Sequence, residues 1–179
     1  MSILGFFCDK GSFKEEEKMI LREVESRDFE RILELNEESV HYLSPLDMEK
    51  LRRLWEQSEM FSVVECDGMV EAFVLTIREG KDYDSLNYLW FSNNYKEFLY
   101  IDRVVVSEKM QGKGLGKMLY RSVFQHAREM GVPYVTAEID VNPPNPGSLR
   151  FHEGFGFKEV GRQAVAEGKK EVSLQAVEI

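Results

Sequence analysis

The chain has 179 residues, a length that predicts one domain. Hydrophobic residues make up 43% and charged residues 31%, so the composition is neither that of a disordered chain nor that of a membrane protein. Acids outnumber bases by 32 to 23, and the net charge of −9 argues against nucleic-acid binding and leaves room for basic substrates. The two cysteines, Cys8 and Cys66, exclude a disulfide scaffold and a cysteine-based zinc site, and they favour a reducing, cytoplasmic location.

Residues 1–18 are predicted to be a loosely ordered N-terminal extension. Their apolar start, residues 2–8, is too short for a signal-peptide core and has no positive charge before it. No run in the chain reaches the roughly 18 apolar residues of a membrane helix, so no membrane partner is expected. Residues 19–179 are expected to form the single domain.

The domain is predicted to begin with a strand and two helices. Residues 19–24 have the composition of a strand. Asp28 is placed to cap a helix that reaches about residue 40, because an apolar stripe at helical spacing follows it. Asp47 is placed in the same way to cap the second helix.

A hairpin is predicted next, formed by strands 61–66 and 69–77 around a tight turn at Asp67 and Gly68. Residues 79–97 are polar and aromatic without a clear period. They are therefore predicted as a long loop, and long loops inside compact domains are often functional.

The last third is predicted to alternate strands and helices. Residues 98–106 form a strand, 114–130 a helix that ends before Gly131, 134–141 a strand and 148–153 a short helix. Two closing strands are predicted at 157–160 and 171–177. The order β-α-α-β-β-β-α-β-α-β-β predicts a mixed α/β sheet.

Charge is unevenly distributed along the chain. Residues 19–80 carry a net charge of −8, whereas residues 107–132 carry +3. Such a basic segment is either a solvated helix face or a local anion site. Its bases are Lys109, Lys113, Lys117, Arg121 and Arg128.

A glycine-rich turn in this segment favours the anion site. Glycines let the backbone approach an anion closely, and the first N–H groups of the following helix have no internal partner. A Walker A loop is excluded because Gly116 and Lys117 are followed by Met118, and a dinucleotide fingerprint is excluded because its third glycine position holds Lys117. The motif that remains is Gln-x-x-Gly-x-Gly, formed by Gln111, Gly114 and Gly116.

This motif strongly resembles the pyrophosphate loop of the GNAT superfamily, the acyl-CoA-dependent N-acetyltransferases. Residues 145–157 also match the family pattern Asn-x-x-Ala/Ser-x-x-Phe/Leu-Tyr-x-x-x-Gly-Phe at every position but one. The resemblance covers about residues 19–179 and is strongest over 98–160. It implies the GNAT fold, a central mixed, mostly antiparallel twisted sheet flanked by helices.

The resemblance also implies a reaction and a cofactor site. Acetyl-CoA is the expected acyl donor and an amine the acceptor, with direct attack in a ternary complex and no metal. In the family, the strand before the loop splays from its neighbour and its free backbone groups bind the pantetheine and the thioester carbonyl. A homodimer is left open. The implied cofactor-binding residues are Val104, Val105, Val106, Gln111, Gly112, Lys113, Gly114, Leu115, Gly116, Lys117, Asn145, Ser148 and Phe151.

Two carboxylates are candidates for the general base that takes a proton from the amine. Asp102 lies on the strand before the loop and is expected to share a face with Tyr100 and Val104. Asp140 lies on the next strand and is expected to share a face with Glu138. Partial burial would raise the pKa of either acid toward the useful range. The alternative for each is a structural ion pair.

His152 stands where the family usually has a tyrosine beside the sulfur of CoA. An imidazole can donate a proton near neutral pH, so His152 is a catalytic candidate, and the alternative is a histidine that only packs or forms hydrogen bonds. This departure leaves open a non-catalytic acyl-CoA-binding or sensing domain with the same fold. A structural domain without nucleotide binding conflicts with the glycine-rich loop.

The resemblance places the acceptor site among the first two helices and the segment before the fourth strand. Aromatic side chains gather there, and together with the −8 region they favour a small amine or an exposed protein amine. The alternative is that these aromatics only pack. They are Tyr42, Trp55, Tyr83, Tyr88, Trp90, Phe91 and Tyr95.

Overall fold

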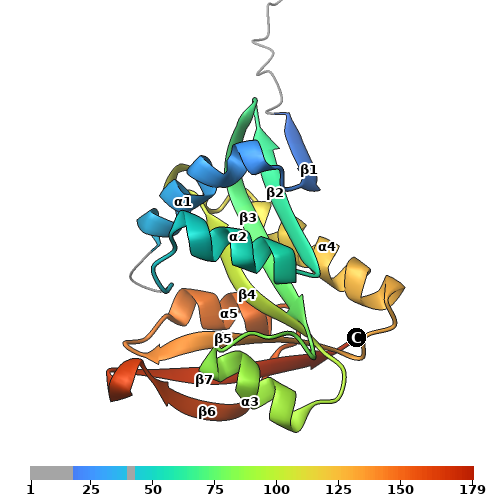
Figure 1. The fold of residues 1–179 in the computed structure, drawn as a ribbon, viewed down its shortest axis with the longest axis vertical. Coiled ribbons are helices and arrows are strands. Elements are labelled where there is room, and N and C mark those ends of the chain that lie inside the picture. Colours follow the sequence, from blue (N-terminus) through green and yellow to red (C-terminus); the bar gives the residue numbers. More distant parts are fainter. Residues whose placement is uncertain (1–17, 40–42) are drawn as a thin grey trace, which may run out of the picture.

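The computed structural model describes residues 18–39 and 43–179, so the predicted extension (except Lys18) and Tyr42 lie outside the described residues. Seven strands form one sheet in the order β1-β2-β3-β4-β5-β7-β6 (Figure 1). All neighbouring strands are antiparallel except β4 and β5, which are parallel. The strands are β1 (Met19–Glu23), β2 (Met60–Cys66), β3 (Met69–Arg78), β4 (Leu99–Val106), β5 (Tyr134–Asn142), β6 (Lys158–Val165) and β7 (Lys170–Glu178).

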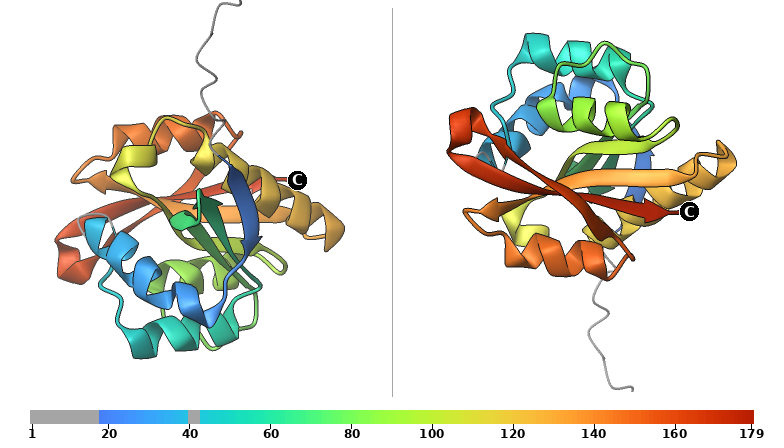
Figure 2. Two further views of the ribbon diagram at one scale, coloured as in Figure 1. Left: turned by 90° about the horizontal axis from the view of Figure 1, so that it is seen from above. Right: turned by 90° about the horizontal axis from the view of Figure 1, so that it is seen from below.

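Five α-helices in the described residues cover both faces of the sheet, and Figure 2 shows α1, α2 and α3 on one face and α4 and α5 on the other. Two hydrophobic cores lie between the helices and the sheet, one on each face. None of the helices in the described residues has the length and apolar character needed to span a bilayer. The helices are α1 (Phe29–Glu38), α2 (Met48–Gln57), α3 (Leu86–Asn94), α4 (Leu115–Glu129) and α5 (Pro146–Glu153).

The two helix caps predicted near the N-terminus have different outcomes. Asp47 caps α2 as expected, because its carboxylate accepts a hydrogen bond from Lys50 N at 2.7 Å. Asp28 precedes α1, but its carboxylate makes no capping bond to that helix. It binds the guanidinium of Arg22 at 2.7 Å and the amide of Glu25 at 2.8 Å instead. A stronger, charge-assisted partner therefore replaces the predicted cap.

The prediction that residues 79–97 form a loop is wrong, because α3 lies within them. Ser85 caps the helix by accepting a hydrogen bond from Tyr88 N. Tyr88 and Phe91 are buried against Phe98 and against Tyr100 of β4, so tertiary packing stabilises a helix that has little amphipathic pattern of its own.

The parallel pair β4 and β5 stays together over a very short distance. Leu99 pairs with Val135 and Tyr100 with Thr136, and in the described part of the chain the pairing stops there. Beyond Tyr100 the two strands diverge, while β4 continues to pair with β3 on its other side as far as Val106. The β5-facing backbone groups of the second half of β4 therefore have no strand partner.

A β-bulge sits at the start of this divergence. Leu75 pairs with Arg103 and Thr76 with Ile101, so Asp102 is the extra residue. The bulge shifts the alternation of side chains along β4. Tyr100 packs into the core under α1 to α3, whereas Val104 packs into the core under α4. The expectation that Asp102, Tyr100 and Val104 share one face of the sheet is therefore wrong, because Val104 lies on the opposite face from Tyr100.

Candidate active site

A cleft of about 660 Å³ opens where β4 and β5 diverge. Both strands line it, together with the start of α3, the start of α5 and the β6–β7 turn. The structure brings six of the predicted site residues into this one cleft, and the others lie in the glycine-rich loop, at the end of β4, in the first turn of α4 or on α5. The six are Asp102, Val104, Asp140, Asn145, Ser148 and His152.

Asp102 is held by two donors. Its carboxylate accepts a hydrogen bond from the Tyr83 hydroxyl at 2.5 Å and one from Arg103 Nε at 3.1 Å. The Asp102 and Arg103 side chains are 5% and 3% exposed. Arg103 also binds Asn36 and Ser44, so Asp102 belongs to a buried polar network that connects β4 to α1.

Asp140 has a cationic partner as well. Its Oδ2 lies 3.1 Å from Nζ of Lys170 at the start of β7, and the Asp140 side chain is buried. Both predicted base candidates are thus in ion pairs, the alternative role that the sequence left open for each.

Glu138 is the titratable residue of the cleft that the sequence did not single out as a base. It lies on β5 and lines the cleft between the two diverging strands. It accepts a hydrogen bond from the Tyr100 hydroxyl at 2.7 Å. The pKa of Glu138 is raised to about 7, chiefly by burial and also by the charge of nearby Asp102, while hydrogen bonds from Tyr100 and Asn87 act in the opposite direction. Alternation along β5 placed Glu138 beside Asp140, but the Tyr100 and Asn87 contacts were not evident from the sequence.

His152 lies on the wall of the cleft and is 4% exposed. Its Nδ1 lies 2.8 Å from the carbonyl oxygen of Ser148, which can only accept, so Nδ1 carries the proton. Its Nε2 then accepts from the Tyr120 hydroxyl at 2.6 Å. Burial lowers the pKa of His152, so the ring is neutral at pH 7.

The glycine-rich loop leads from β4 through the short 3-10 turn η2 (Glu108–Met110) to the N-terminus of α4. Gly112 and Gly114 have φ angles of +77° and +95°, a region that side chains disfavour. The first hydrogen bond of α4 joins Met118 N to Gly114 O, so the amides of its first turn have no acceptor in the helix. A Cβ added at Gly114 would meet nothing within 4 Å. The loop therefore has open space and unpaired donors that fit a pyrophosphate.

The remaining predicted cofactor residues have structural contacts. Gly116 lies beside the Phe151 ring of α5, and a Cβ there would be in ordinary van der Waals contact with the ring at 3.5 Å. Asn145 caps α5 by accepting a hydrogen bond from Ser148 N at 3.1 Å. Gln111 reaches back to Val106 O at the end of β4. These contacts hold together the loop and helix that flank the cleft.

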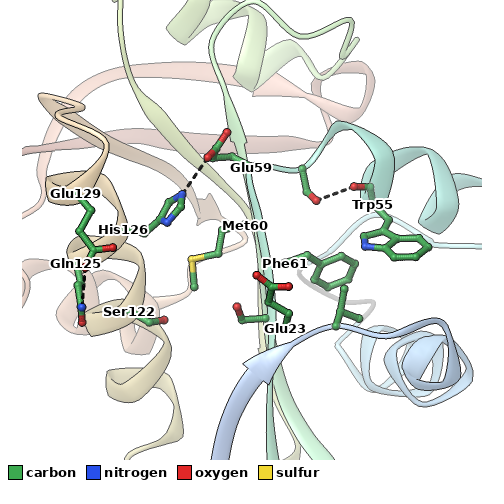
Figure 3. Close-up of a pocket in the computed structure, with 12 residues that line it drawn as sticks. Glu23, Trp55, Glu59, Met60, Phe61, Ser122, Gln125, His126 and Glu129 are labelled. Atoms are coloured by element: carbon green, nitrogen blue, oxygen red, sulfur yellow. Dashed lines mark hydrogen bonds and ion pairs between the residues drawn. The ribbon is translucent and has the colours of Figure 1, made fainter.

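A second pocket, of about 430 Å³, lies between α2 and α4 where β1 ends (Figure 3). It is lined by the carboxylates of Glu23, Glu59 and Glu129, and His126 Nε2 lies 3.0 Å from Glu59. It contains neither the diverging strands nor the glycine-rich loop. In the described residues no group of three or more His, Cys, Asp or Glu side chains is placed to hold a metal ion.

Residues 29–157 match the model of the acetyltransferase (GNAT) family. The chain belongs to this family. The fold class is confirmed as the GNAT fold, and acetyl-CoA is the cofactor of the family's reaction.

Proteins similar to this chain come from a mammal, an archaeon and a bacterium. The chain is 26% identical over 81 residues to N-acetyltransferase 8F1 of Rattus norvegicus, and this match covers 45% of the chain and 36% of that relative. Ard1 from Thermoplasma volcanium has a TM-score of 0.74 at 16% identity, covering 90% of this chain and 97% of that one. The protein yncA from Salmonella typhimurium, solved with its cofactor acetyl-CoA, has a TM-score of 0.68 at 21% identity, covering 89% and 93%. These structures share the GNAT fold with the chain.

Proposed function

We propose that this GNAT protein is an N-acetyltransferase that moves an acetyl group from acetyl-CoA to a primary amine by direct attack in a ternary complex. The observation that carries the proposal is Glu138, a carboxyl group with a pKa of about 7 in the cleft between β4 and β5. A base with this pKa is well matched to removing a proton from an amine near neutral pH. When bound, acetyl-CoA supplies the thioester carbonyl that the amine attacks.

The glycine-rich loop, the start of α4 and the second half of β4 are proposed to bind and orient acetyl-CoA. The first-turn amides of α4 and the helix dipole bind the pyrophosphate, and the side chains of Lys113 and Lys117 add positive charge. The backbone groups of Val104, Val105 and Val106 that face β5, where β4 has no strand partner, hold the pantetheine arm and polarise the carbonyl. The amine then approaches from the opposite side of the cleft.

Glu138 is proposed as the general base in preference to Asp102 and Asp140. Its hydrogen-bond donors, Tyr100 and Asn87, are neutral, so no partner cation holds it in the charged form. Asp102 and Asp140 each have a cationic partner within 3.1 Å. We assign both to positioning the strands, and the charge of Asp102 also raises the basicity of Glu138.

His152 and Tyr120 are proposed to form the wall beside the thiol. We expect His152→Phe to lower turnover several-fold or more and to leave acetyl-CoA affinity largely unchanged, because the Tyr120 hydroxyl then lacks the acceptor that orients it. Steady-state kinetics and calorimetric acetyl-CoA binding measure the two effects. His126→Phe, in the second pocket, is the matched control and should change neither. Unchanged turnover in His152→Phe would remove His152 from the mechanism.

The acceptor is proposed to be a primary amine of a small molecule or a protein. The cleft carries the ion pairs of Asp102 with Arg103 and of Asp140 with Lys170, and Glu138 is the acid of its inner wall whose hydrogen-bond donors are neutral, so Glu138 can accept a hydrogen bond or a proton from an amine. A panel of small amines and of peptides with free α- or ε-amines, incubated with acetyl-CoA and analysed by mass spectrometry, tests this. We expect acetylated product from at least one class. Background thioester hydrolysis alone across the panel would count against the enzyme.

The alternative is a non-catalytic acyl-CoA-binding or sensing domain, which the buried, neutral His152 favours. Both readings predict that acetyl-CoA raises the melting temperature, and only the enzyme predicts product. We also propose a cytoplasmic location, supported by the low cysteine content. A homodimer stays a proposal that size-exclusion chromatography with light scattering tests.

A further inference from the structure

A buried carboxylate lies outside the cleft, at the other end of the glycine-rich loop. Glu71 on β3 is 3% exposed. One of its oxygens lies 2.6 Å from Nζ of Lys109, and the other accepts a hydrogen bond from the Ser107 hydroxyl at 2.6 Å. Its backbone oxygen also accepts from Ser107 N at 2.8 Å. Arg31 of α1 lies 3.7 Å from the same carboxylate.

These contacts hold the chain at the point where it leaves the sheet. The last pair between β3 and β4 joins Ala72 to Val106, so Ser107 is the first residue that the sheet no longer fixes. Glu71 binds this residue through both its backbone and its side chain. The next link in the loop runs from Met110 N to Ser107 O at 2.9 Å. The path of the loop toward α4 therefore starts from a residue that Glu71 holds.

The Lys109 contact changes the interpretation of the basic segment. Lys109 is one of the five bases that give residues 107–132 their charge of +3. Its ammonium is bound to Glu71, so its charge is already compensated. Burial of a carboxylate is unfavourable without such partners, and Lys109 and Ser107 supply them.

We propose that Glu71 is a positioning residue for acetyl-CoA, which ties Ser107 and Lys109 to β3 and so aligns the glycine-rich loop with the first turn of α4. The inference rests on the proposed binding of acetyl-CoA at this loop. For the affinity of CoA, the inference predicts a change in the opposite direction to the one that simple electrostatics predicts. Removing a negative charge near an anion site should strengthen anion binding, whereas loss of the loop's anchor should weaken it.

The test is the affinity of free CoA for Glu71→Gln, measured by calorimetry on the full chain. We expect CoA binding to weaken about tenfold, while kcat at saturating acetyl-CoA stays within about twofold. Ser107→Ala, which keeps every charge, should weaken CoA binding in the same direction by a smaller factor. Glu108→Gln is the matched control, since it removes one negative charge from the exposed side of η2 and should leave CoA binding unchanged or slightly tighter.

Hydrogen exchange of the protein without ligand separates this inference from the proposed function. Glu71→Gln should speed exchange at the amides of Met110 and Gln111, and Glu108→Gln should not. Unchanged or tighter CoA binding in Glu71→Gln would overturn the inference. If the unmodified protein failed to bind CoA, the proposed function would fail, and unaltered exchange at Met110 and Gln111 would then overturn the anchoring role as well.

Discussion

Replacing Glu138 by glutamine is expected to lower kcat/KM for the amine by roughly 10²- to 10⁴-fold, the usual contribution of a general base. The amide keeps the size of the side chain and its place beside Tyr100, but it cannot accept a proton. Acetyl-CoA binding should be unchanged, because Glu138 is not among the residues proposed to hold the cofactor. Kinetics with the best amine of the panel, together with acetyl-CoA calorimetry, measure both quantities.

The pH dependence gives this prediction a second readout. A base works in its deprotonated form, and the deprotonated fraction of Glu138 rises as pH rises through its pKa of about 7. For the unmodified protein kcat/KM should therefore increase with pH, reach half its maximum near pH 7 and level off above it. Glu138→Gln should lose this rise.

Asp140→Asn is the matched control for Glu138. It removes a carboxylate from the same strand, two residues away, but from an ion pair with Lys170. We expect a clearly smaller loss of kcat/KM and a retained rise near pH 7. If Asp140→Asn or Asp102→Asn abolished activity while Glu138→Gln did not, the assignment of the base to Glu138 would be wrong.

Gly114→Glu is expected to weaken CoA binding by at least about 100-fold. The φ angle of +95° disfavours any side chain, at a cost of about 1–2 kcal/mol. The new carboxylate would also stand at the N-terminus of α4, in the open space where the pyrophosphate binds. Calorimetry with CoA and the thermal shift caused by acetyl-CoA both report the loss.

The other end of the same helix offers a control. Gly131 follows α4, has a φ angle of +68°, and a Cβ there would also meet nothing within 4 Å. Gly131→Glu therefore makes the same charge change with a similar backbone strain, and both variants should lose a comparable amount of thermal stability. CoA binding that is lost equally in both variants would show that the Gly114 effect is only destabilisation.

The strand, turn and helix start around the glycine-rich loop could be predicted from the sequence because the signals for them are local. The positive φ angles at Gly112 and Gly114, the start of α4 and the apolar strand before it depend on neighbours a few residues apart. The hairpin turn at Asp67 and Gly68 was predicted for the same reason, and both residues have positive φ angles. Helix α3 was missed because its stability comes from burying Tyr88 and Phe91 against distant strands.

The amino-acid sequence alone thus determined the family and the order of the strands along the chain, and it predicted an anion site at the glycine-rich loop. Long-range packing decided the rest of the site. Glu138 became the base candidate through its burial in the cleft that opens where β4 and β5 diverge. The ion pair between Lys109 of η2 and Glu71 of β3 likewise depends on the register of β3 and β4, because that register sets where the chain leaves the sheet. A pKa or an ion pair depends on which groups burial brings together, and adjacent residues do not specify that.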